Sequence, residues 1–321
     1  MSGRILVIRG GAIGDFIVTL PAIAALRRQF PGIRLELVGY PGIATLALEY
    51  GWVDAVQPIE ARPLAGFFAR NGVLDPQWST YFEGFHVILT YLFDPDEIFR
   101  NNLARVTKAQ LIQGPHRPDE SNPAHATDQL LVPLQKLAIF DADPVPSLNL
   151  KLNAAASGLT ALPWIAVHPG AGGAHKVWPR ERWLELLGRL LETQPIRLLL
   201  VGGEAELETL NELSRHLPSE RIETAVNWPL PRLSRRLAEC SGFLGHDSGI
   251  AHLAAACGLP GVVLWGPTQS SIWRPRSSRV DLVLAPEGHL EDLTTAEAER
   301  RVAVAVSGWI RERPSVPRDA G

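Results

Sequence analysis

The chain has 321 residues, of which 46% are hydrophobic and 20% are charged, an ordinary composition for a soluble globular protein. Single hydrophobic cores stop growing before this length, so we expect two domains. The net charge of −3 and the absence of a Lys/Arg run argue against a nucleic-acid partner. Cys240 and Cys257 are too far apart for a C-x-x-C pair, which excludes a zinc ribbon or disulfide framework and favours the cytoplasm.

The first half of the chain alternates between strand and helix patterns. Apolar runs predict strands at residues 5–9, 35–39, 86–93 and 110–114. Helical spacing predicts helices at residues 16–30, 43–50, 96–106 and 127–140. Residues 58–85 are irregular and rich in aromatic rings, and a loop of that length is usually functional. Its rings could touch a lipid surface, but packing in the core is their more ordinary use.

The second half repeats this alternation after a stretch of small residues at 151–162, which is typical of a linker. Strands are predicted at residues 164–168, 197–202, 222–226, 242–245 and 262–265. Helices are predicted at residues 181–193, 205–217, 233–240, 250–257 and 295–313. Strands separated by helices form parallel sheets, which bind ligands at the carboxyl ends of their strands.

The fold class expected is therefore α/β, with two Rossmann-like parallel-sheet domains facing each other across a cleft. We place the domains at residues 1–155 and 156–313. The last helix, at about 295–313, is free to pack back on the first domain. Residues 314–321 are expected to be a disordered tail.

The most informative segment runs through Asp247, Ser248 and Gly249. It lies between a buried strand and a short helix, and Asp247 and Ser248 are good N-caps. The free N–H groups and the positive end of that helix form a phosphate site from backbone alone, which Gly249 lets the ligand approach. His252 faces the cleft or is a satisfied structural histidine. The predicted buried stripe of the helix consists of Ile250, Leu253, Ala254 and Cys257.

Two further loops follow predicted strands of the second half. The loop after residues 164–168 contains three glycines, whose amides can turn toward an anion, and Trp178 should pack beneath it. Lys176 adds a positive charge suited to phosphate, the alternative being a solvated lysine. After residues 197–202, Glu204 or Glu206 could accept both hydroxyls of a ribose or stabilise the first turn of a helix.

The first glycine turn runs from Arg9 to Asp15. It fails as a dinucleotide fingerprint because Arg9 stands at the first glycine position, and no acid follows the second strand. A dehydrogenase is therefore disfavoured. Asp15 begins a helix, where it could be an N-cap or a general base at the mouth of the cleft. A weak base is adequate for a sugar hydroxyl that becomes acidic only as its bond to carbon forms.

Two D-x-D patterns, at residues 94–96 and 141–143, match a metal–diphosphate motif. Because the pattern occurs twice, loop and cap acids are the simpler interpretation. The histidines show no H-E-x-x-H spacing. We therefore predict neither a metal site nor a cofactor.

Together these segments resemble glycosyltransferase family nine, the lipopolysaccharide heptosyltransferase family. The motifs appear in the order of that family and spread over most of the chain. The residues that carry the resemblance are Ile13-Gly14-Asp15, Thr19-Leu20-Pro21, His168-Pro169-Gly170-Ala171, Lys176, Trp178-Pro179, Glu181-Arg182-Trp183, Gly202-Gly203, Glu206, Asp247-Ser248-Gly249, His252 and Gly266-Pro267-Thr268.

The resemblance implies a GT-B fold, with the acceptor on the first domain and a nucleotide-diphospho-sugar donor on the second. It implies an inverting, metal-independent displacement with Asp15 as base. Lys176 would hold the diphosphate, Glu206 the ribose, and Asp247 the donor sugar. The remaining donor-binding candidates are Gly170, Ala171, Ser248, Gly249 and His252, and Arg9 and Gly14 are candidates for acceptor or phosphate contacts.

The expected protein is a bacterial, cytoplasmic enzyme that moves heptose or a related sugar from an ADP-sugar to a lipid-linked glycan such as lipopolysaccharide core. Membrane contact would be at most peripheral, since Arg9 and Asp15 interrupt any signal-peptide core and no long apolar run follows. Residues 226–231 and 58–122 depart from the family pattern, so another donor or acceptor is an alternative. Further alternatives are a GT-A enzyme using Asp94 and Asp96, an epimerase, and a non-catalytic nucleotide-sugar-binding protein.

Overall fold

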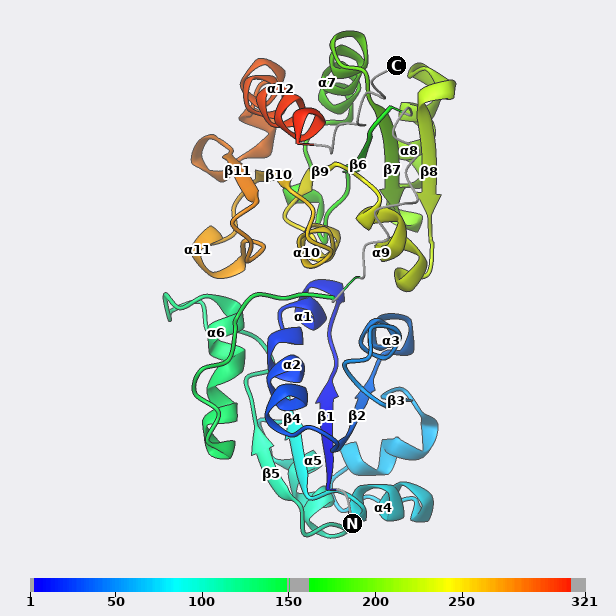
Figure 1. Ribbon diagram of the computed structural model, residues 1–321. Coiled ribbons are helices and arrows are strands. Elements are labelled where there is room, and N and C mark those ends of the chain that lie inside the picture. Colours follow the sequence, from blue (N-terminus) through cyan, green and yellow to red (C-terminus); the bar gives the residue numbers. More distant parts are fainter. Residues whose placement is uncertain (1–2, 149, 151–161, 313–321) are drawn as a thin grey trace, which may run out of the picture. The chain divides into compact units, whose positions relative to one another are not determined.

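The computed structural model describes residues 3–148, 150 and 162–312, in two compact units that divide after Leu148 (Figure 1). Each unit contains one parallel sheet with helices between its strands. The predicted boundary at 155/156, the predicted linker at residues 151–162 except for its last residue, and the tail at 314–321 lie outside the described residues.

The sheet of the first unit has the strand order β3-β2-β1-β4-β5, and every pairing is parallel. The order reverses beside β1, so the loop after β1 lies at the switch point where ligands of such sheets bind. Its strands are β1 (Arg4–Arg9), β2 (Arg34–Gly39), β3 (Ala55–Pro58), β4 (Val87–Thr90) and β5 (Gln110–Gln113). Its α-helices are α1 (Ile13–Ile17), α2 (Leu20–Gln29), α3 (Pro41–Glu49), α4 (Pro76–Glu83), α5 (Ile98–Ala104) and α6 (Ala126–Leu131), and its 3-10 helices are η1 (Arg62–Phe68) and η2 (Val132–Leu137).

The single helix predicted over residues 16–30 is wrong. The chain forms α1, turns, and begins α2, with Pro21 in the first turn of the second helix. Proline fits there because it has no N–H to donate and would clash inside a continuous helix. The hydroxyl of Thr19 donates to the carbonyl of Asp15 at 2.7 Å and closes the turn. In the same way, the helix predicted over residues 127–140 is α6 followed by η2, which has Pro133 in its first turn.

The aromatic segment at residues 58–85 is not a long loop. It folds into η1 and α4, and Asp75 caps α4 by accepting from the amide of Trp78 at 3.0 Å. Phe67, Phe82 and Phe85 are buried in the core of the first unit. Packing in the core is therefore confirmed as the use of these three rings.

The sheet of the second unit has the order β11-β10-β9-β6-β7-β8 and is parallel throughout. Its strands are β6 (Trp164–His168), β7 (Arg197–Gly202), β8 (Ile222–Val226), β9 (Gly242–His246), β10 (Gly261–Trp265) and β11 (Val280–Leu284), of which β11 was not predicted. Its α-helices are α7 (Arg180–Thr193), α8 (Leu207–His216), α9 (Leu230–Ala238), α10 (Gly249–Ala256), α11 (Ser270–Trp273) and α12 (Thr295–Arg311). Its 3-10 helices are η3 (Ala174–Lys176), η4 (Glu204–Glu206), η5 (Ser219–Arg221), η6 (Pro286–Gly288) and η7 (Leu290–Asp292).

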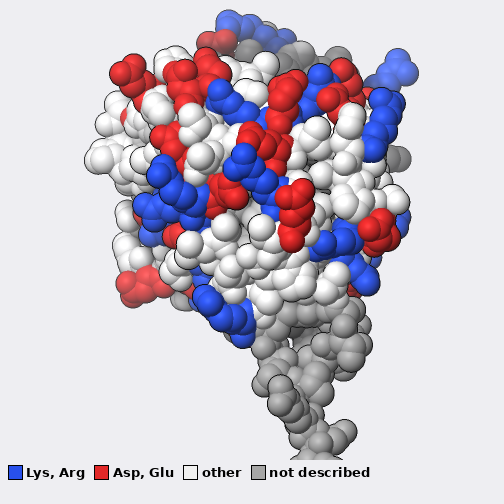
Figure 2. Space-filling view, turned by 90° about the horizontal axis from the view of Figure 1, so that it is seen from above, with Lys and Arg blue, Asp and Glu red and all other residues white. Residues whose placement is uncertain are grey.

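The core of the second unit lies between its sheet and the apolar faces of α7 and α12. Trp309 of α12 packs directly over Gly242 of β9. At the surface, Arg189 of α7 pairs with Glu299 of α12 at 2.8 Å. Figure 2 looks onto the end of the molecule where α7 and α12 lie in Figure 1, and shows positive and negative side chains interspersed there.

Replacing Gly242 by alanine should destabilise the second unit, because a Cβ there would overlap the indole of Trp309. Overpacking of this kind costs about 1–3 kcal/mol. As a control, Gly188→Ala in α7 adds a Cβ with open space around it and should stabilise the helix by roughly 0.5–1 kcal/mol. Urea unfolding gives the free energy of unfolding of each variant. Equal changes in the two variants would contradict the packing of Trp309 over Gly242.

Candidate functional site

The second sheet reverses its strand order between β6 and β9. The loops that follow these two strands therefore start side by side at the carboxyl edge, where α/β sheets bind ligands. The first loop carries Gly170, Ala171 and Lys176, and the second carries Asp247 and Ser248. The fold thus brings together five of the donor-binding candidates that the sequence indicated.

The carboxylate of Asp247 joins these loops. Its Oδ2 accepts from the ammonium of Lys176 at 2.7 Å and from the hydroxyl of Thr268 at 2.7 Å. The side chain of Asp247 is 10% exposed and that of Lys176 is 23% exposed, so the ion pair is only partly screened by water. The interpretation of Lys176 as a solvated lysine is wrong, and Thr268 is a partner that the sequence analysis did not assign.

Helix α10 begins directly beside this ion pair. Ser248 is its N-cap and accepts from the amide of Ala251 at 3.3 Å, whereas Asp247, also expected to cap, does not. The first amides of any helix have no acceptor within it and carry the positive end of its dipole. Gly249 begins the helix and follows Asp247 by two residues, so its amide and the ion pair belong to the loop at the end of β9.

The buried stripe predicted for α10 is confirmed at Leu253, Ala254 and Cys257, but the helix contacts α9, β9 and β10 and buries more than this stripe. Ile250 of the predicted stripe is only half-buried, while Ala251 and His252 are buried. His252 is 5% exposed, so the alternative of a structural histidine fits better than a side chain that faces a cleft.

His246, the last residue of β9, supports the glycine loop from below. Its Nδ1 lies 3.2 Å from the carbonyl of Gly170, and its Nε2 accepts from the amide of Trp178 at 3.0 Å. Burial lowers the pKa of His246 from 6.5 to about 3, although the bond to Gly170 acts in the opposite direction. Trp178 is fully buried and its indole donates to the carbonyl of Leu293 at 2.8 Å, which confirms that it packs beneath the loop.

Glu206 lies at the neighbouring end of β7. Its Oε2 accepts from the amide of Gly203 at 2.8 Å and so caps the 3-10 turn that leads into α8. Its carboxyl group also packs against Gly170, where a Cβ would overlap it. Glu204 is exposed, whereas Glu206 is half-buried. Of the two acids, Glu206 is therefore the one placed against the glycine loop.

In the first unit, Asp15 lies in α1, directly after β1. It is not the N-cap residue that the sequence predicted, but the third residue of the helix. Its Oδ2 accepts from the amide of Ala12 at 3.0 Å, and the side chain remains 28% exposed. Gly14 precedes it in the same helix, and Gly11 has a φ of +97°, which glycine adopts without strain.

Arg9 holds this turn in place from beneath. Its guanidinium donates to the carbonyl of His116 at 2.7 Å and to that of Asp15 at 3.1 Å, and it lies 3.6 Å from the Asp15 carboxylate. Burial lowers the pKa of Arg9, while the charges of Asp15 and Tyr91 oppose that shift. The buried arginine thus acts on the backbone around Asp15, and has little surface left for a ligand.

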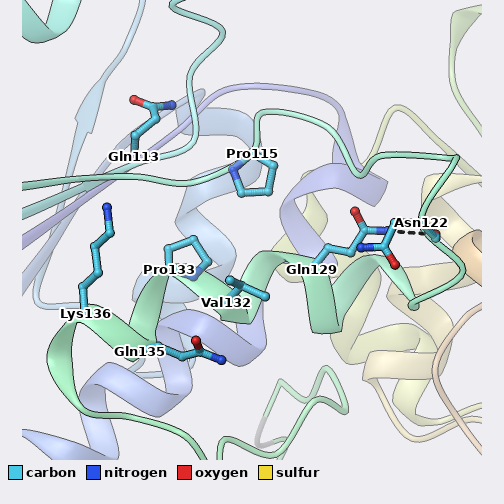
Figure 3. Close-up of a pocket in the computed structure, with 8 residues that line it drawn as sticks. All are labelled: Gln113, Pro115, Asn122, Gln129, Val132, Pro133, Gln135 and Lys136. Atoms are coloured by element: carbon cyan, nitrogen blue, oxygen red, sulfur yellow. Dashed lines mark hydrogen bonds between the residues drawn. The ribbon is translucent and has the colours of Figure 1, made fainter.

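A pocket of about 410 Å³ lies on the edge of the first unit, between the loop after β5 and the helices α6 and η2 (Figure 3). It contains none of the site residues predicted from the sequence. Within it, Gln129 accepts from the amide of Asp119 at 2.8 Å and donates to the carbonyl of Ala124 at 2.8 Å, which fixes the adjoining loop. The lining residues are Gln113, Pro115, Asn122, Gln129, Val132, Pro133, Gln135 and Lys136.

The acids of the two D-x-D patterns act on local backbone. The carboxylate of Asp94 accepts from the amides of Phe99 and Arg100 at 3.1 and 2.9 Å, and Asp143 accepts from the amide of Val145 at 3.0 Å. The interpretation as cap and loop acids is confirmed for both residues. Over residues 3–148, 150 and 162–312, no three His, Cys, Asp or Glu side chains are grouped to hold a metal ion.

Solved glycosyltransferases have the same fold, with two α/β units that each contain a parallel sheet. The structure titled Escherichia coli heptosyltransferase WaaC with ADP matches with a TM-score of 0.73 and 19% identity over 94% of this chain and 99% of that one. A family 9 glycosyltransferase from Veillonella parvula matches with a TM-score of 0.76 and 16% identity over 97% of this chain and 98% of that one. These likenesses show the GT-B fold that was expected.

Residues 121–303, more than half of the chain, match the sequence model of glycosyltransferase family 9 (heptosyltransferase). Lipopolysaccharide heptosyltransferase 1 of Pseudomonas aeruginosa is 26% identical over 83% of this chain and 79% of that protein. The enzyme of the same name from E. coli K12 is 24% identical over 91% of this chain and 97% of that protein. The chain therefore belongs to glycosyltransferase family 9 and is a glycosyltransferase, as its motifs predicted. Within the described residues, no helix combines the length and apolar character that a membrane span requires.

The buried His246 should make the second unit sensitive to acid. Its folded-state pKa of about 3 lies below the ordinary 6.5. Between these two values the unfolded chain binds a proton at His246 and the folded protein does not. The resulting stability is present above pH 6.5 and is lost as the pH falls toward 3. Between pH 7 and pH 5 this loss is about 2 kcal/mol. Urea unfolding at pH 7 and pH 5 should therefore show that His246→Gln loses less stability than the wild type. Some loss should remain in the variant, because burial also lowers the pKa of His168. Equal losses in the two proteins would contradict a neutral His246.

Proposed function

We propose that this glycosyltransferase moves heptose or a related sugar from an ADP-sugar to a hydroxyl of a lipid-linked glycan, such as lipopolysaccharide core. The observation that carries the proposal is the Lys176–Asp247 ion pair beside the first turn of α10. The pair fixes an ammonium at the carboxyl edge of the sheet, and an ammonium together with helical amides suits a diphosphate. Relatives named lipopolysaccharide heptosyltransferase and a heptosyltransferase solved with ADP-2-deoxy-2-fluoro heptose support the choice of donor.

The second unit, whose bounds the sequence predicted at residues 156–313, is the proposed donor site. Lys176 and the amides of Ser248 and Gly249 hold the diphosphate, with help from the backbone of the Gly170–Ala171 turn. Glu206 accepts the ribose hydroxyls through its Oε1, because Oε2 already caps Gly203. Asp247 contacts the donor sugar with its Oδ1, because its Oδ2 already accepts from Lys176 and Thr268.

The proposed reaction is a direct displacement with inversion at the anomeric carbon. The acceptor oxygen forms a bond to that carbon as the bond to the β-phosphate oxygen breaks, and the hydroxyl proton passes to the carboxylate of Asp15. Lys176 and the α10 amides stabilise the charge that develops on the leaving ADP, a role that positioned dipoles and cations fill well. On this proposal no metal ion is needed, and added chelator should leave the rate unchanged.

The first unit is the proposed acceptor site, with Asp15 as base and Arg9 as the residue that fixes its turn. Transfer of the sugar to a lipid-linked core glycan would be direct evidence for this acceptor. A lipid-linked acceptor requires only peripheral contact with a membrane. Release of free sugar or conversion of the donor without any acceptor would instead favour a hydrolase or an epimerase.

Asp15→Asn should lower the transfer rate by about a hundredfold or more, the usual share of general-base catalysis. Asparagine can still accept from the amide of Ala12, so the turn should survive. The matched control is Asp75→Asn, which alters a capping carboxylate of the same unit away from this turn and should leave the rate unchanged. Steady-state transfer and ADP-sugar affinity are measured together, and a collapse of donor affinity in Asp15→Asn would make Asp15 a donor ligand.

Among ADP, UDP, GDP, CDP and NAD at matched concentrations, ADP should raise the unfolding temperature most. A ligand at a hundred times its Kd adds about 2.7 kcal/mol of stability, or several degrees. Lys176→Ala should reduce the ADP shift, because it removes the charge that meets the diphosphate. Lys136→Ala, which removes an exposed lysine from the pocket of the first unit, serves as control. A larger shift with UDP or GDP would reassign the donor, and a shift with NAD alone would overturn the proposal.

A further inference from the structure

His246 makes two hydrogen bonds to one loop, at opposite ends of it. Its Nδ1 lies 3.2 Å from the carbonyl oxygen of Gly170, and its Nε2 lies 3.0 Å from the amide nitrogen of Trp178. The imidazole has no exposed surface. Between these two partners the chain forms the glycine turn and η3, which carries Lys176. One buried side chain thus ties the start of this loop to its end.

The two contacts fix the protonation of the ring. A backbone amide can only donate, so Nε2 must accept from Trp178 and carries no hydrogen. The hydrogen is therefore on Nδ1, which donates to the carbonyl of Gly170. A doubly protonated ring could not accept from Trp178, and burial holds the pKa of His246 at about 3. The same pair of bonds is consequently present throughout the ordinary pH range.

Backbone contacts within the loop do not replace this one, although the Lys176–Asp247 ion pair also ties the loop to the residue that follows β9. Within the loop, the amide of Lys176 donates to the carbonyl of Gly173 at 3.0 Å, and that of Val177 to Ala174 at 3.1 Å. These are local turns, and they do not connect the loop to the sheet. Without the imidazole, the carbonyl of Gly170 and the amide of Trp178 would lose their partner, which is costly for groups in buried residues.

We propose that His246 is a positioning residue for the phosphate groups of the donor. This inference rests on the proposed function, because it assumes that Lys176 and the α10 amides meet a nucleoside diphosphate. His246 and Asp247 follow one another at the end of β9: the first fixes the backbone of the loop, and the second pairs with its lysine. The lysine is then held in its binding position before the ligand arrives, so that binding does not have to order the loop.

His246→Phe tests the proposal, since it keeps a ring but removes both hydrogen bonds. His246→Gln keeps a donor and an acceptor in one side chain and should restore part of the function. Trp183→Phe is the control: Trp183 packs edge-on against His246 with ring centres 5.2 Å apart, and no hydrogen bond joins its side chain to the loop among the described residues. Each variant is assayed for amide exchange in residues 170–178 of the free protein, ADP affinity, and the separate changes in kcat and KM.

We expect His246→Phe to speed amide exchange across residues 170–178 and to weaken ADP by about tenfold or more, with His246→Gln in between. The KM for donor should rise more than kcat falls. Trp183→Phe should lose stability while keeping wild-type exchange in the loop and wild-type ADP affinity. Unchanged exchange in His246→Phe, or faster exchange with unchanged ADP affinity, would overturn the positioning role.

If the wild-type protein binds no nucleoside diphosphate, the proposed function fails at that step, whatever the variants do. The exchange measurement on the free protein still decides whether His246 holds the loop. Equal losses of ADP affinity in His246→Phe and Trp183→Phe would show that general stability, and not the two hydrogen bonds, controls binding.

Discussion

One oxygen atom, Oδ2 of Asp247, joins the loops that follow three neighbouring strands of the second sheet. It accepts from Lys176 after β6 and from Thr268 after β10, while Asp247 itself follows β9. A carboxylate that is only 10% exposed would be costly without a cation, so the ion pair constrains the position of the lysine as well as its charge. The geometry exists because all three strands run parallel and end at the same edge.

This arrangement explains how a charge already paired in the free protein can still serve a ligand. The ammonium of Lys176 has three donors, and the ion pair with Asp247 uses one of them. On the proposed function, a diphosphate would therefore bind the same ammonium without breaking the pair. The amides at the start of α10 add partial positive charge that needs no reorganisation. On that proposal these groups contact only phosphate, so other residues would have to recognise the nucleobase.

Much of the second unit could be predicted from its sequence, because central parallel strands are continuous apolar runs. The central strands β6 and β7 were placed with their bounds as observed, and so was the edge strand β8, although it is only partly buried. The edge strand β11 has Asp281 among its apolar residues and was not predicted. The break between α1 and α2 was missed because the apolar pattern continues through it, and proline at the start of a helix leaves that pattern intact.

The candidate site was predictable only in part, and for a physical reason. Lys176, Glu206 and Asp247 follow strands, so their place at the carboxyl edge could be derived from chain order. Thr268 and His246 could not be assigned, because each acts through a partner distant in sequence, and those of His246 are backbone atoms. The one available signal for His246 was a titratable residue at the end of an otherwise apolar strand.

On the proposed function, the carboxylate of Asp15 has both a structural and a chemical role. One oxygen caps Ala12 and thereby fixes the direction of the side chain, which remains 28% exposed. Arg9 binds the carbonyl of the same residue and lies 3.6 Å from its carboxylate, which favours the observed direction of the side chain. A carboxylate is too weak a base to remove a proton from a free sugar hydroxyl. If Asp15 is the base, proton transfer must therefore accompany formation of the glycosidic bond, and a fixed direction matters more than basicity.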